Sequence, residues 1–214
     1  MNITWAGYAC FKIEGSSLTI ITDPFDPSSG LKLSSKKADV VISSCEGPYH
    51  GNVEAIKEKG KEIKVITSPG EYEIQETFIY GIPVKVRSKK GSGGDIVIYR
   101  IEMEGLTLVH LGALETPLEN GQLEHFEKTD IMFVPVGGGN YLNAVSAREL
   151  ISQISPKIVI PMCYKVSGAK LSLDGIEKFY KEMGVKPQEV LPKLKVSKKD
   201  LTLEETNIKV LGIE

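Results

Sequence analysis

The 214-residue sequence has few of the side chains that bind transition metals or form disulfides. The three cysteines and the three histidines are Cys10, Cys45, Cys163, His50, His110 and His125. An odd and sparse cysteine count argues against a disulfide framework. The apolar runs are too short to span a bilayer, and the first residues have no basic region of a signal peptide. We therefore expect a cytoplasmic protein with no membrane partner.

An excess of charge of one sign is also absent. The formal net charge is −2 and the sequence pI is about 6.0, with lysines only in short pairs, so nucleic acid is not an expected partner. Hydrophobic residues make up 41% of the chain, which is enough for a substantial core. The length fits one large domain or two small ones, and we assign residues 1–214 to a single domain.

Short β-rich runs recur from one end of the chain to the other, and many are continuous in Val, Ile and Leu, as in strands buried on both sides. The predicted strands are Ile3–Trp5, Cys10–Glu14, Leu18–Asp23, Val40–Ser43, Lys64–Thr67, Glu73–Ile74, Thr77–Tyr80, Asp95–Glu102, Leu106–Leu111, Ile131–Val136, Lys157–Pro161 and Ile208–Leu211. The predicted helices are Val53–Lys59, Glu119–Phe126, Ala144–Ile154 and Gly175–Met183, with Asn52 and Asp174 as N-caps of the first and last.

The order of these elements predicts an α/β (α+β) fold, a four-layer αββα sandwich with helices on its outer faces. A doubly wound parallel sheet is the rival fold. The sandwich is favoured because the first strands follow one another with no room for crossover helices.

The segment from Cys45 to His50 lies between an apolar strand and a predicted helix start. This strand–loop–helix resembles that of the metallo-β-lactamase superfamily, in which the loop reads His-x-His-x-Asp-His. Aligned without a gap, the loop has Cys45, Gly47, Tyr49 and His50 at these four positions. One of the four ligands is therefore unchanged.

Further blocks extend the resemblance in the right order over nearly the whole chain. They are similar to the branch that contains ascorbate-6-phosphate lactonases and predicted zinc-dependent hydrolases. These blocks are the opening Ile3–Glu14, the strand ending at Asp23-Pro24, the segments Ser68–Ile74 and His110–Leu114, the strand Asp130–Gly138 and the strand Lys157–Tyr164.

The resemblance implies a centre in which two metals activate water and polarise a carbonyl or phosphoryl oxygen. Most of its ligands are replaced here. By the resemblance, Ala113 aligns with the carboxylate that bridges the two metals, and Cys163 aligns with the final His ligand. A further His position falls, by a looser alignment, on Arg87, which is cationic and cannot ligate a metal but could fill the charge space of one.

The residues expected at the residual pocket are Cys45, Glu46, Tyr49, His50, Arg87, Ala113, Cys163 and Tyr164. Cys45 and Cys163 are interpreted as small buried residues in preference to ligands. The alternative is a single zinc on Cys45, His50 and Cys163, with water or Glu46 as fourth ligand. His50 is either a leftover ligand or, as favoured, a hydrogen-bonded residue at a helix start. A Cys45–His50 nucleophilic pair lacks support.

The sequence thus predicts a scaffold that has lost the two-metal reaction, with no cofactor and a non-catalytic role in ligand binding or assembly. The alternative is a metal-dependent hydrolase of phosphoester or lactone bonds that uses the atypical Cys45, His50 and Cys163 site. The aromatic and cationic residues of the pocket favour a small anionic ligand. Relatives of this kind often self-associate, so a homo-oligomer is an expected partner state.

Overall fold

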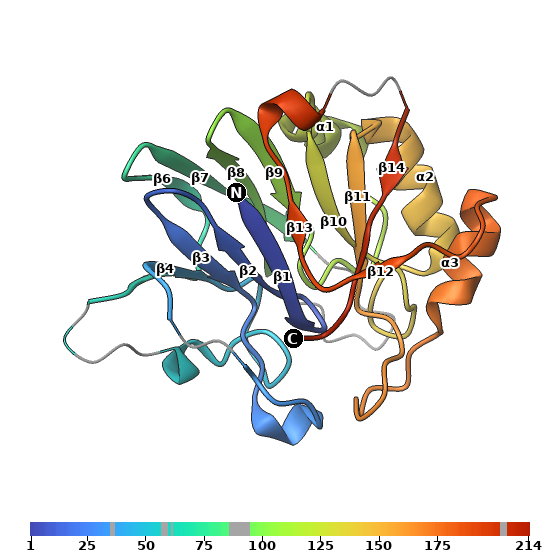
Figure 1. Cartoon of the computed structure of the whole chain (residues 1–214), viewed down its shortest axis with the longest axis horizontal. Coiled ribbons are helices and arrows are strands. Elements are labelled where there is room, and N and C mark those ends of the chain that lie inside the picture. The colour runs from blue at the N-terminus through green and yellow to red at the C-terminus, as the bar shows by residue number, and fades with distance from the viewer. Residues whose placement is uncertain (35–36, 57–59, 61, 86–94, 202–204) are drawn as a thin grey trace.

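The computed structural model describes residues 1–34, 37–56, 60, 62–85, 95–201 and 205–214. Two large sheets pack face to face (Figure 1). The first has the strand order β13-β1-β2-β3-β4-β5, and the second has the order β14-β11-β10-β9-β8-β7-β6. A short pair, β12 and β15, forms a third sheet. The mixed α/β sandwich predicted from the sequence is confirmed.

The strands of the first sheet are β1 Asn2–Gly7, β2 Cys10–Glu14, β3 Thr19–Thr22, β4 Val40–Ile42, β5 Lys64–Ile66 and β13 Leu194–Lys195. Those of the second are β6 Gly70–Ile74, β7 Thr77–Lys85, β8 Asp95–Met103, β9 Leu106–His110, β10 Ile131–Pro135, β11 Ile158–Met162 and β14 Asn207–Ile208. The small sheet pairs β12 Val190–Leu191 with β15 Val210–Leu211.

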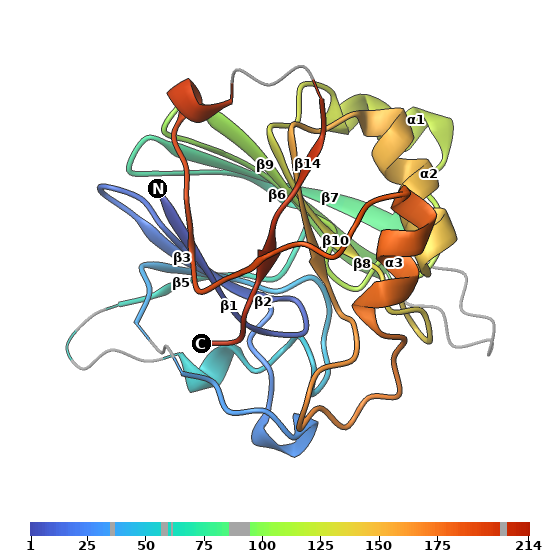
Figure 2. The same cartoon turned by 45° about the vertical axis from the view of Figure 1, so that its right-hand side comes forward.

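The helices are α1 Asn120–Leu123, α2 Ala144–Ile154 and α3 Ile176–Met183, with 3-10 turns η1 Pro27–Ser29, η2 Val53–Ala55, η3 Glu124–Phe126 and η4 Lys198–Asp200. The three α-helices lie on the outer side of the second sheet, away from the first (Figure 2). The α2 helix has its predicted bounds because Asn143 Oδ1 accepts from Ser146 N at 2.9 Å, and Ser155 ends it in a left-handed conformation. None of the helices in the described residues is long and apolar enough to cross a membrane.

Three of the four predicted helices differ from the structure. The helix predicted at Glu119–Phe126 is the short helix α1 followed by the turn η3. The chain after Asn52 forms only the turn η2, and Ile56 is already extended and buried; residues 57–59 lie outside the described residues. The Asn52 side chain makes no cap, because its Nδ2 donates to Phe25 O at 3.1 Å. At the start of α3 the N-cap is Gly175 and not Asp174, whose side chain accepts from Lys178 Nζ at 2.7 Å.

The core lies between the inner faces of the two sheets. Phe11 on β2 meets Phe133 on β10, with ring centroids 4.6 Å apart, and Trp5 on β1 stacks on Phe11 at 6.2 Å. The strands β10 and β11 are buried along their whole length, as their continuous apolar sequences predict. This interlocking fixes the position of one sheet on the other.

The same packing brings strand ends together. In the first sheet β3 and β4 are parallel, and in the second β9, β10 and β11 are parallel. Parallel neighbours end at the same edge of a sheet, so the loops after β3 and β4 lie at one edge of the first sheet and those after β9, β10 and β11 at one edge of the second. A hydrogen bond of 3.2 Å from Cys163 N to Tyr8 O joins the two sheets at these edges. The candidate site forms here.

Candidate functional site

Asp23 is the centre of the polar network at this edge. It follows β3 with a left-handed φ of 39°, and its carboxylate is fully buried. Oδ1 accepts from Ser44 N at 2.6 Å, and Oδ2 accepts from Ser44 Oγ at 2.7 Å. Because Ser44 follows the parallel strand β4, two neighbouring strand ends are fastened together by one carboxylate.

His50 extends the network. Its Nδ1 lies 2.9 Å from Asp23 Oδ2, and its Nε2 lies 2.8 Å from the hydroxyl of Tyr141. A carboxylate can only accept, so Nδ1 carries a proton, and Nε2 shares a hydrogen bond with the Tyr141 hydroxyl. The backbone holds the ring in place, since Ser43 Oγ donates to His50 O at 2.9 Å. Both ring nitrogens of His50 are therefore engaged within the protein.

The pKa of Asp23 reflects this arrangement. Burial alone would raise the pKa, but the charge and hydrogen bond of His50, and the hydrogen bond from Ser44, hold it below its ordinary value of 3.8. The carboxylate is thus ionised at neutral pH and satisfied by three donors. An ionised group of this kind without those partners would be costly to bury.

Tyr141 reaches the site from a glycine-rich turn after β10. Gly138 and Gly139 both have positive φ, at 65° and 69°, and Tyr141 N donates to Gly138 O at 3.1 Å. The side chain is 7% exposed, and its pKa is raised well above 10 by burial. The Tyr141 hydroxyl is therefore neutral, and it is the last group of the network, next to His50 Nε2.

Two thiols adjoin this network. Cys163 follows β11, is fully buried and has a left-handed φ of 51°, whereas Cys45 is half-buried in the loop before His50. Burial, with the nearby Asp23 charge, raises the pKa of Cys45 to about 12 and that of Cys163 well above 9. Both are neutral thiols at neutral pH, whereas nucleophilic attack needs the thiolate. The raised pKa of the Cys45 thiol does not favour a Cys45–His50 nucleophilic pair.

The other predicted pocket residues have different surroundings. Tyr49 packs edge-on against Tyr8, with ring centroids 5.3 Å apart, and Ala113 N donates to Ser44 Oγ at 3.2 Å. Glu46 is exposed in the loop. Tyr164 lies against Trp5, with ring centroids at 5.1 Å, so it contributes to the core. Arg87 lies outside the described residues.

His110 is the other buried imidazole near this edge. Its ring packs against both Phe11 and Phe133, with centroids 6.2 and 5.7 Å apart, and its Nε2 donates to Ala9 O at 2.9 Å. Within the described part of the chain its Nδ1 has no hydrogen-bond partner. Burial lowers the pKa of His110 despite the opposing charge of Asp23. His110 is therefore a neutral histidine of the core.

The sequence interpretation underrated Asp23 and missed Tyr141. The sequence places Asp23 only at the end of a predicted strand. In the structure Asp23 accepts from the backbone of Ser44 and also bonds His50. A signal for Tyr141 was present in Gly137-Gly138-Gly139-Asn140-Tyr141, because a tight turn after a buried parallel strand places the next polar side chain at the strand-end edge.

The donors at this edge do not fit a two-metal centre. The loop position Gly47 has no side chain, and Ala113 offers only backbone. His50 has no free ring nitrogen in this arrangement. Across the described residues, no three or more His, Cys, Asp and Glu side chains are grouped so that they could hold a metal ion.

Comparison with known proteins places the chain in a family. Residues 2–163 match the family described as the Beta-lactamase superfamily domain. The chain belongs to this superfamily. A Thermotoga maritima structure that is described as a Zn-dependent hydrolase of the metallo-beta-lactamase superfamily is 30% identical to this chain, with a TM-score of 0.79. The match covers 98% of this chain and 97% of that one.

Curated superfamily relatives are similar over most of their length. A UPF0173 metal-dependent hydrolase of Pyrococcus furiosus is 26% identical over 223 residues, covering 90% of this chain and 96% of the relative. One of Archaeoglobus fulgidus is 24% identical over 193 residues, covering 77% and 83%. The predicted resemblance to the superfamily is thus confirmed, while its lactonase branch stays a prediction.

Proposed function

We propose that this superfamily member does not catalyse two-metal hydrolysis and has a non-catalytic role in ligand binding or assembly. The region of its scaffold that corresponds to the metal centre is a closed hydrogen-bond network. One observation carries the proposal. Both nitrogens of His50, the one loop ligand that the sequence retains, are engaged, by Asp23 and by Tyr141. A metal at Nε2 would have to displace the Tyr141 hydroxyl from a buried site.

The substitutions around His50 support the same proposal. The positions of the bridging carboxylate and the middle histidine, Ala113 and Gly47, have no side-chain donor. The two thiols that could replace lost ligands are held neutral by burial. Tyr49, at the position of the loop aspartate, packs on Tyr8.

The rival function is metal-dependent hydrolysis of phosphoester or lactone bonds through Cys45, His50 and Cys163. The names of the relatives favour it, since the Pyrococcus and Archaeoglobus proteins are called metal-dependent hydrolases. The small anionic ligand predicted from the sequence depends on Arg87 and stays a prediction. Homo-oligomer formation and a cytoplasmic location stay predictions as well.

Metal content separates the two functions. Protein purified without chelator or added metal is analysed for zinc, iron and manganese, beside Cys163→Ala and Tyr141→Phe variants. The proposal expects far less than one metal per chain in all three proteins, and no hydrolysis of model phosphodiesters or lactones when these metals are added. A near-stoichiometric metal that disappears in Cys163→Ala, together with hydrolysis that needs it, would establish the rival.

A variant with restored ligands makes a positive control. Cys45→His, Gly47→His, Tyr49→Asp, Ala113→Asp and Cys163→His together return the superfamily pattern to the same strand ends. If the wild-type chain lacks metal because of its side chains, the restored chain binds metal in the same assay. If neither chain binds metal, the assay conditions are inadequate, and the wild-type result is repeated with metal added during expression.

A further inference from the structure

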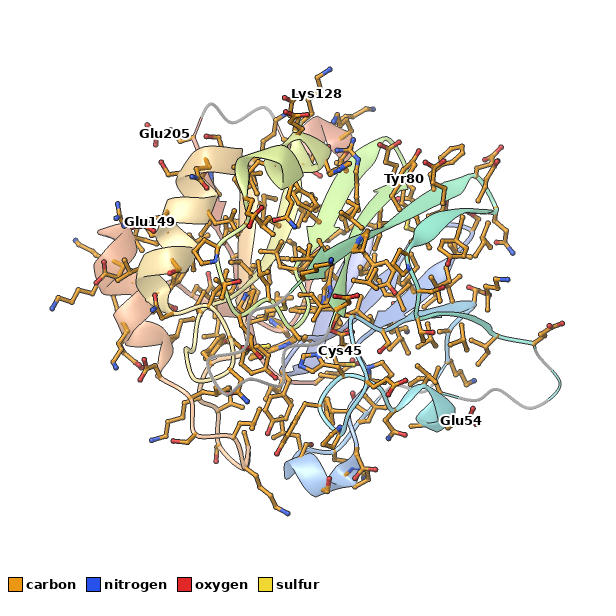
Figure 3. The ribbon with its side chains drawn as sticks, turned by 180° about the vertical axis from the view of Figure 1, so that it is seen from behind. Cys45, Glu54, Tyr80, Lys128, Glu149 and Glu205 are labelled. Atoms are coloured by element: carbon orange, nitrogen blue, oxygen red, sulfur yellow. The ribbon has the colours of Figure 1, made fainter. Side chains whose placement is uncertain are left out.

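A groove of about 770 Å³ lies far from the His50 network, on the outer face of the second sheet. Its floor is made by the first residues of β6 and by the middle of β7, and its rim is made by η3 and the turn that follows. In Figure 3 the labelled Tyr80 and Lys128, which both line the groove, lie well away from Cys45. The volume is in the range of small-molecule sites.

The floor of the groove is largely apolar. Strand alternation turns Ile79 into the core and leaves Tyr80 and Ile82 half-exposed on the outer face, next to Pro83. The register places Glu71 of β6 and Arg100 of β8 on either side of Tyr80. An aromatic ring is thus flanked by a carboxylate on one strand and a guanidinium on the next.

Arg100 is a structural part of the wall and has little charge to offer a ligand. Its Nη1 donates to the backbone carbonyls of His125 at 3.2 Å and Glu127 at 2.9 Å. Its Nε and Nη2 donate to Glu102 Oε1 at 3.1 and 2.8 Å. These bonds fasten the η3 rim to the sheet and neutralise the guanidinium, so the groove keeps its shape without a ligand.

The other charges of the groove are predominantly negative. Glu71, Glu124 and Glu127 line it with exposed side chains, and none has an ion pair among the described residues; the exposed Lys128 is the opposing charge. Carboxylates with no ion pair in the described chain, beside a partly exposed tyrosine ring, suit a cation with an apolar body, because the ring face and the carboxylates both attract positive charge.

We propose that this groove binds a small organic cation, an amine whose apolar or aromatic body lies on Tyr80 and Ile82 and whose ammonium group faces Glu71 and Glu127. A second copy of the chain is a poorer occupant. Pairing of two β6 edge strands about Tyr72 would set Glu71 of each copy opposite Glu73 of the other, and like charges opposite one another destabilise a strand pair. The proposal is independent of metal content at His50.

The test uses two probes that share a body and differ in charge. Tyramine and 4-hydroxyphenylacetate are titrated into the full ¹⁵N-labelled chain and followed by amide chemical shifts. We expect saturable shifts with tyramine at β6, β7 and η3, and binding at least about tenfold weaker for the carboxylate, the equivalent of roughly 1.4 kcal/mol. Equal or tighter binding of the carboxylate, or no saturable shift with tyramine at millimolar concentration, overturns the proposal.

Matched variants locate the site. Glu71→Gln and Glu127→Gln are each expected to weaken tyramine binding about two- to fivefold, as for exposed charge pairs. Glu73→Gln, a neighbour on β6 that does not line the groove, leaves binding unchanged. All three side chains are exposed, so the variants fold. Weakening by Glu73→Gln equal to that by Glu71→Gln would show a general charge effect and refute the site.

Discussion

The His50 network and the Tyr80 groove differ in how their polar groups are satisfied. In the network the groups are buried and pair with one another: Asp23 has three donors, and His50 has two partners. In the groove the carboxylates are exposed and have no such partners in the described chain. A group committed to internal bonds stabilises the fold, whereas an uncommitted group is available to a ligand. The region that resembles an active site is therefore the less available of the two.

The largest expected difference between the regions comes from removing a charge. Asp23→Ala leaves three donors without their acceptor in a buried site and should lower the free energy of unfolding by about 3–5 kcal/mol. Glu71→Gln in the groove should change it by less than about 0.5 kcal/mol. Urea unfolding followed by circular dichroism measures both. Equal effects would mean that the network carries no more of the stability than the surface does.

The close packing around Ser44 gives a second contrast. A Cβ at Gly112, where φ is 53°, would overlap the Ser44 side chain that holds Asp23, so Gly112→Ala should cost about 2–4 kcal/mol in strain and overpacking. Gly105 has a similar φ of 73° but open space around it, so Gly105→Ala should cost only the conformational part, about 1–2 kcal/mol. Thermal unfolding of the pair isolates the packing contribution, and identical losses would contradict it.

A single hydroxyl tests how closed the network is. Tyr141→Phe removes the partner of His50 Nε2 and should cost about 1–3 kcal/mol, because a buried ring nitrogen is left without a hydrogen bond. Tyr72→Phe removes a hydroxyl that bonds Ser68 at 3.1 Å near the surface, and little loss is expected there. If Tyr141→Phe proved as stable as the wild type, water would have to reach Nε2, and the site would be more open than its contacts indicate.

The sequence could predict the fold because its strands are buried and continuous. Stretches such as Ile131–Pro135 and Ile158–Met162 are continuously apolar and therefore predict buried strands. Asn143 and Ser155 bound α2 through local capping. The short turn at Val53–Ala55 was misjudged as a helix. The apolar residue Ile56 is buried in an extended conformation, and its burial comes from tertiary contacts and not from a helical face.

The candidate site was harder to predict because its bonds are non-local. Superfamily resemblance identified His50, but Tyr141 is 91 residues away in sequence and Asp23 is 27 residues away. Only the convergence of parallel strand ends brings them together. The groove gave no motif at all, since it depends on the register of Glu71, Tyr80 and Arg100 across three strands.

The smallest expected effect concerns the pH dependence of stability. Burial lowers the pKa of His110 in the folded chain below its ordinary 6.5, so between that lowered value and about 6.5 the unfolded chain binds a proton that the folded chain does not. Stability therefore falls as the pH decreases through this interval, by at most about 1.4 kcal/mol per pH unit. His110→Gln keeps a donor for Ala9 O but cannot titrate, so its unfolding free energy should be flatter between pH 7 and pH 5. An equally steep decline in the variant would assign the acid sensitivity to other groups, whereas a flatter one would show that a neutral buried imidazole, rather than a charged ligand site, occupies this part of the strand-end edge.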